Sequence, residues 1–77
     1  MKTKNKKFAS ELSTRCKNGL IGCFGYRDII HLPERIARAG VGKLLLAKNI
    51  GVGGLQEIAE ALYKHGYIAD PDQWLEN

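Results

Sequence analysis

Apolar residues recur at helical intervals along most of the chain, and no run alternates between apolar and polar residues as a strand would. Three stripes repeat every three or four residues: Leu12, Cys16 and Leu20; Ile29, Leu32 and Ile36; and Leu55, Ile58, Ala59 and Leu62. Each stripe gives a helix one face to bury. The pattern therefore predicts an all-α fold, a compact bundle of four to five short helices.

Capping residues, glycines and prolines divide this pattern into elements. Ser10 or Ser13 can cap a first helix, and Asp70 followed by Pro71 has the form of a cap with proline at the first helical position. The predicted helical segments cover about 13–21, 27–32, the stretch from Pro33 to Gly40, 43–48, 55–65 and a last turn at 74–75. The strongly basic start predicts a disordered tail over residues 1–9 and a single helical domain over residues 10–77.

The stretch from Asn49 to Leu62 is a glycine-rich turn that opens directly into an amphipathic helix. With the apolar segment 43–48 it has the form of a helix-hairpin-helix. Glycines allow another backbone to approach closely, and the first N–H groups of a helix favour an anion. The turn at Gly51, Gly53 and Gly54 therefore predicts a phosphate-binding site. The alternative is that these glycines only allow close helix packing.

Charge is distributed unevenly along the chain. Residues 1–48 contain 11 Lys and Arg against 3 Asp and Glu, a net +8, and residues 49–77 contain 1 against 5, a net −4. The sum is the overall +4. A basic half favours a polyanionic partner such as nucleic acid, the alternative being an ordinary solvated surface with a basic tail.

Composition and motifs argue against several other classes of protein. The longest aliphatic run, Leu44–Ala47, is far shorter than the roughly 18 residues of a membrane span, and no signal peptide follows the lysines, so we expect a cytoplasmic protein without a membrane partner. Cys16 and Cys23 are expected as small buried thiols rather than metal ligands. Glu57 and Glu60 are expected on a solvated helix face. No catalytic motif, metal site or cofactor site is complete, so we do not expect an enzyme.

Two segments resemble the C-terminal domain of the bacterial RNA polymerase alpha subunit. The segment from Glu11 to Leu20, with Arg15 and Asn18, is similar to the first helix of that domain. The segment from Asn49 to Leu62 is similar to its hairpin and last helix. The resemblance covers roughly residues 11–75 and is looser in the middle. Without an assembly domain or a long linker, the chain is expected to be a stand-alone relative from a bacterium or a phage.

The resemblance implies a fold and a set of DNA contacts. That family forms a bundle of four or five helices, binds the minor groove of A/T-rich promoter DNA, and contacts activators and sigma factor. By position, Arg15 would enter the minor groove, as an Arg favours the negative potential of a narrow groove. Asn18 and the backbone around Gly51 would hold phosphate or sugar. Glu57 would lie at the edge used for DNA or protein contacts.

The hairpin turn departs from the family pattern. The family has a lysine and then a small hydroxyl residue where this chain has Gly53 and Gly54, so two side-chain contacts to phosphate are lost. Lys43, Lys48 and the N-terminal lysines are the candidates to replace them. Two hypotheses follow. The first is a double-stranded DNA-binding protein that acts in transcription. The second is a protein-interaction module that binds RNA polymerase, sigma factor or a regulator.

Overall fold

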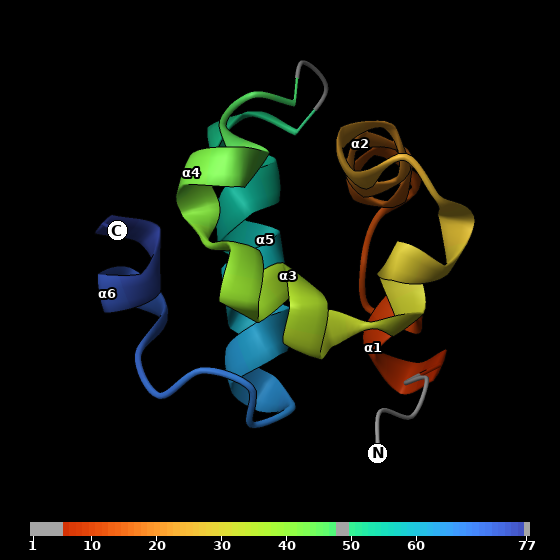
Figure 1. Cartoon of the computed structure of the whole chain (residues 1–77). Coiled ribbons are helices and arrows are strands. Elements are labelled where there is room, and N and C mark those ends of the chain that lie inside the picture. Colours follow the sequence, from red (N-terminus) through yellow and green to blue (C-terminus); the bar gives the residue numbers. More distant parts are fainter. Residues whose placement is uncertain (1–5, 48–49, 77) are drawn as a thin grey trace.

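The computed structural model describes residues 6–47 and 50–76, and the regular secondary structure in this part of the chain is helical, without strands. Six short α-helices and one 3-10 helix surround a single core (Figure 1). They are α1 (Lys6–Ser10), α2 (Thr14–Phe24), η1 (Arg27–His31), α3 (Pro33–Ala39), α4 (Val41–Leu44), α5 (Gly51–Lys64) and α6 (Pro71–Glu76). The predicted all-α class is confirmed. The Cα radius of gyration is 10.9 Å, close to the ~11.5 Å expected for one compact domain of this length.

The structure differs from the expected disordered tail at Lys6–Ala9. These residues belong to α1, and Phe8 is completely buried while Ala9 is nearly so. Phe8 packs edge-on against His65, with ring centroids 6.0 Å apart. The physical reason is that burying one aromatic side chain offsets the cost of ordering a single helical turn. Residues 1–5 of the predicted tail lie outside the described residues.

Helix α2 has the cap that the sequence predicts at its start. The Ser13 hydroxyl accepts a hydrogen bond from the backbone N–H of Cys16 at 3.2 Å. The helix then continues past Gly22 and ends at Gly25, whose N–H donates to the carbonyl of Ile21 at 2.8 Å. Its last helical residue is therefore Phe24, three residues later than the predicted end at about Ile21. Cys16 and Leu20 lie on its buried face, as the spacing predicted.

The two helices that flank the glycine-rich turn have different limits from those predicted. The predicted helix 43–48 is α4, which begins at Val41 because Val41 and Leu44 both bury their side chains in the core. It ends at Leu44, and the next residues form a turn. The predicted helix 55–65 is α5, which begins at Gly51, so the glycines form its first turn.

The last helix, α6, packs against α5 and α4. Asp70 caps this helix, since its Oδ1 atom accepts hydrogen bonds from the N–H groups of Asp72 and Gln73 at 3.0 and 3.2 Å. The buried Trp74 donates its ring N–H to the carbonyl of Ala37 at 3.1 Å. Within residues 6–47 and 50–76, no helix has the length and hydropathy of a membrane span.

Candidate nucleic-acid interface

Helix α2 packs against both α4 and α5. At one end the thiol of Cys23 donates to the carbonyl of Lys43, with 3.4 Å between sulfur and oxygen. Further along, the thiol of Cys16 donates to the carbonyl of Gly54 at 3.6 Å. Burial raises the pKa of the Cys16 thiol, which keeps its proton available for that bond. We call this line of contacts the α2 seam.

Ile50 fills the middle of the α2 seam and is almost completely buried. A Cβ atom built on Gly19 would lie 2.4 Å from Cγ1 of Ile50, and one built on Gly54 would lie 2.8 Å from its Cγ2 and 3.2 Å from Sγ of Cys16. The two distances to Ile50 are shorter than the approach of two carbon atoms allows. Gly19 and Gly54 therefore provide the space for Ile50. Close packing thus accounts for the glycine at position 54.

Glu57 closes the seam at the start of α2. Its Oε1 atom accepts a hydrogen bond from the backbone N–H of Ser13 at 2.5 Å. In a capping box this N–H is bound by an acidic residue three positions further along the same helix. That position is Cys16, so α5 supplies the carboxylate instead. The Ser13 N–H holds the pKa of Glu57 below its ordinary value.

This pairing predicts a dependence of stability on pH. The pKa values of Glu57 and Glu11 both lie below the ordinary 4.5, Glu11 because it is bound by His65 and Lys64. Depressed carboxyl pKa values contribute stability at pH values above 4.5, and this contribution is lost as the pH falls through the lowered values. We expect the urea midpoint to fall between pH 5 and pH 3 by less in Glu57→Gln than in the unchanged protein. An equal fall in both proteins would contradict the pairing.

Arg15 and Asn18 project from the exposed side of α2. They are three residues apart and share one face with Gly22, also exposed. The opposite side of the helix carries the buried Cys16 and Leu20. Arg15 directly precedes Cys16, whose thiol bonds to the carbonyl of Gly54 in the first turn of α5. The end of α2 that carries Arg15 therefore contacts the start of α5.

Among the described residues, the start of α5 has no side-chain cap. Its N-cap residue Ile50 makes no side-chain hydrogen bond to the helix, and no acidic residue lies in the first turn. Gly51, Val52 and Gly53 are exposed there. Gly51 has φ +66°, a left-handed conformation that glycine adopts readily, and the chain enters α5 through it. Uncapped N–H groups at the positive end of a fourteen-residue helix favour an anion.

Of the eight predicted site residues, Gly54 and Glu57 form hydrogen bonds with Cys16 and Ser13. Arg15 and Asn18 are exposed on α2, and Gly51 and Gly53 are exposed in the first turn of α5. Lys43 lies at the other end of the seam, with its Nζ atom 5.2 Å from the centroid of the Phe24 ring. Lys48 lies outside the described residues. The part of the site that can be described therefore spans the first half of α2 and the first turn of α5.

Two contacts of the seam could not be predicted from the sequence. The hydrogen bond between Glu57 and Ser13 joins residues 44 positions apart, so no pattern of neighbouring residues indicates it. The role of Ile50 had one indirect signal, the two glycines at positions 19 and 54. A glycine in the middle of an amphipathic helix is unfavourable unless something packs against it. Both glycines face Ile50 in the structure.

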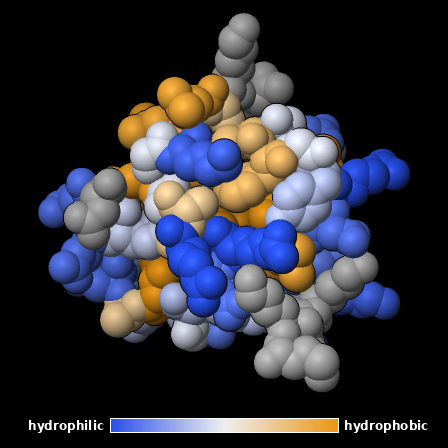
Figure 2. All heavy atoms as spheres, viewed as in Figure 1, coloured by the Kyte–Doolittle hydropathy of each residue, from blue (hydrophilic) through white to orange (hydrophobic). Residues whose placement is uncertain are grey.

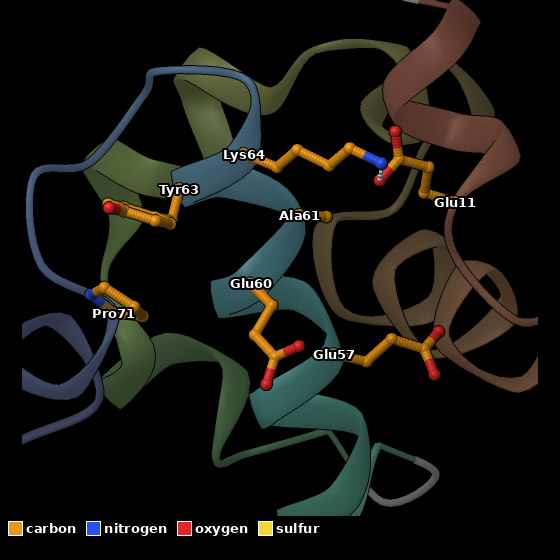
Figure 3. A pocket seen from close by; sticks show the side chains of 7 residues that line it. All are labelled: Glu11, Glu57, Glu60, Ala61, Tyr63, Lys64 and Pro71. Carbon is orange, nitrogen blue, oxygen red and sulfur yellow. Dashed lines mark ion pairs between the residues drawn. The ribbon is translucent and has the colours of Figure 1, made fainter.

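A hollow lies along α5 beside Glu57 (Figure 3). It is lined by Glu11, Glu57, Glu60, Ala61, Tyr63, Lys64 and Pro71. Lys64 Nζ lies 3.4 Å from Oε1 of Glu11, and His65 Nε2 lies 2.8 Å from the other oxygen. Within the described residues, no three His, Cys, Asp or Glu side chains are grouped as metal ligands. The acidic side chains at this hollow thus mostly hold α5 to the segment before α2.

Comparison of the chain with protein-family models, with curated proteins and with solved structures gives no match.

Proposed function

We propose that the protein binds double-stranded DNA through the exposed side of α2 and the uncapped start of α5. One observation carries this proposal. The end of α2 that carries the exposed Arg15 contacts the start of α5, where Gly51 and Gly53 are exposed and the N-cap residue Ile50 provides no side-chain hydrogen bond. Arg15 supplies a charge for the minor groove, and the first turn of α5 supplies N–H donors for a phosphate. Phosphate contacts of this kind position a protein on DNA without selecting a sequence.

The resemblance to the alpha C-terminal domain gives the same assignment from a different starting point. It implies A/T-rich DNA, minor-groove insertion of Arg15 and a role in transcription. The narrow minor groove of A-tracts has an enhanced negative potential that attracts arginine. The absence of a lysine at Gly53 favours modest affinity, because the backbone N–H groups then bind the phosphate without help from a side chain at that position.

A salt titration tests this proposal. We expect the unchanged protein to bind an A/T-rich duplex at low salt, with an affinity that falls linearly with salt on logarithmic axes. Arg15→Ala should weaken binding to A/T-rich duplex by about tenfold, the loss of one good minor-groove contact at about 1–3 kcal/mol. Arg38→Ala, an exposed arginine on α3, is the matched control and should leave binding nearly unchanged. No binding at low salt, or equal effects of the two substitutions, would exclude the proposed site.

A second function is favoured by exposed apolar side chains beside this site. Leu45, Leu46 and Val52 are 65%, 81% and 76% exposed, and they flank the connection from α4 to α5. Figure 2 shows hydrophobic surface on the side of the molecule where this connection lies. Grouped apolar residues on a small monomer indicate a protein contact. With Lys43 exposed nearby in sequence, the fitting partner is an apolar surface with an acidic rim. RNA polymerase and sigma factor are the candidates implied by the resemblance.

Purified components distinguish the two functions. For the second, we expect DNA-free RNA polymerase or sigma factor to bind the protein, and Leu46→Ser with Val52→Ser to lose that binding. Tyr63→Ser, which removes an exposed aromatic side chain from α5, serves as the control. Binding of DNA but of neither protein would leave the first function alone.

A further inference from the structure

A groove runs along the side of α2 that faces away from the seam. It is lined by Thr14, Lys17, Asn18, Ile21, Arg27, Asp28, Ile30 and His31. Positions 14, 17 and 21 of α2 recur at three- and four-residue spacing and face η1. Positions 16, 19 and 23 face the seam. Helix α2 therefore lies between two different surfaces, and Asn18 stands on the edge of the groove.

The groove carries more positive than negative charge. Lys17 comes from α2 and Arg27 from the start of η1, and both are at least partly exposed. Asp28 is the one acidic residue in the lining. Packing of η1 against α2 fixes the two cations on one side of the helix. Lys17 and Arg27 are thus within the surface that a polyanion bound to Arg15 and Asn18, as proposed above, would cover.

The dimensions of DNA indicate how the groove beside α2 could contact it. The minor groove of B-DNA is about 6 Å wide, whereas an α-helix with its side chains is about 10–12 Å across. A helix that inserts an arginine into the minor groove therefore rests across both walls, each a sugar–phosphate backbone. On α2, one flank leads to the first turn of α5 and the other leads to the groove.

We propose that Lys17 and Arg27 bind phosphates of the second DNA strand, opposite the strand that contacts the start of α5. This inference rests on the proposed DNA-binding function and names the second half of its contact surface. The two flanks of α2 then hold the two walls of the minor groove, with Arg15 between them. Lys17 and Arg27 thus provide positive charge on this flank of α2, whereas Gly53 on the other flank provides none.

The slope of affinity against salt tests the assignment. Each phosphate contact made by a cation contributes about 0.9 to the slope on logarithmic axes. Lys17→Gln with Arg27→Gln keeps most of each stem and should reduce the slope by about 2, with similar weakening on A/T-rich and mixed duplexes. Arg27→Gln alone changes an exposed side chain and should reduce the slope by about 1. Circular dichroism checks that each variant keeps its helix content.

A double variant of equal charge change provides the control. Arg38→Gln with Lys64→Gln removes two exposed cations outside the groove and should leave the slope nearly unchanged. If the Lys17 and Arg27 variant has the same slope as this control, the second-strand contact is wrong while the proposed DNA-binding function stands. If the unchanged protein does not bind duplex at low salt, both proposals are wrong.

Discussion

Replacing Phe8 with alanine should lower the free energy of unfolding by about 3–5 kcal/mol, the cost of truncating a fully buried aromatic side chain. Phe8 has no exposed surface and joins α1 to His65 near the end of α5. A domain of this length has a total stability of about 4–12 kcal/mol. The substitution therefore removes a large part of the stability, although residue 8 lies in a basic stretch that looks like a tail.

Equilibrium urea denaturation followed by circular dichroism measures this effect. Lys6→Ala and Lys7→Ala are the matched controls because both side chains are exposed on the same helix. Each should change the free energy of unfolding by no more than about 0.5 kcal/mol. A loss below about 1 kcal/mol for Phe8→Ala would mean that α1 is not part of the folded core in solution.

Replacing Gly19 with alanine should destabilise the protein, although alanine is the better helix former. A glycine-to-alanine change inside an unconstrained helix gains up to about 1 kcal/mol. At Gly19 the new methyl group would lie 2.4 Å from Cγ1 of Ile50, and overpacking of a buried site costs about 1–3 kcal/mol. Gly22 is the control in the same helix, because a Cβ atom there meets nothing within 4 Å. Gly22→Ala should be neutral or stabilising.

A double-mutant cycle isolates the contact between Gly19 and Ile50. Ile50→Ala alone should cost about 2–5 kcal/mol through the cavity it leaves. In the Gly19→Ala background the same change should cost less, by about 0.5–3 kcal/mol, because the added methyl occupies part of that space. Additive effects of the two substitutions would show that they do not share a site, and would contradict the packing of the α2 seam.

The sequence predicted the elements whose signals are local. The four-residue spacing of Cys16 and Leu20 predicted the buried face of α2. Ser13 and Asp70, both predicted as possible caps, are the caps of α2 and α6. Trp74, which lies in the predicted last turn at 74–75, is buried in the core. These features depend on neighbours within one or two helical turns, so the pattern of residue types was sufficient to find them.

Features that depend on distant partners were not predicted. Phe8 was assigned to the tail because lysines surround it, and its burial depends on α5, more than 40 residues away in sequence. Helix α4 begins and ends earlier than predicted, because the burial of Val41 and Leu44 determines its limits rather than the apolar run 44–47. Glu57 was predicted at the edge of a contact surface, and its bond to Ser13 appears only once α2 and α5 are placed together.

Chemical-shift mapping of the ¹⁵N-labelled protein with an A/T-rich duplex tests the central claim most directly. We expect the backbone amides of Arg15, Asn18, Gly51 and Gly53 to shift together as duplex is added, and those of α6 to remain in place. Together, shifts at both elements would place α2 and the start of α5 on one DNA-binding surface. An unchanged spectrum at low salt, or shifts that leave Arg15 and Gly51 unaffected, would contradict the account.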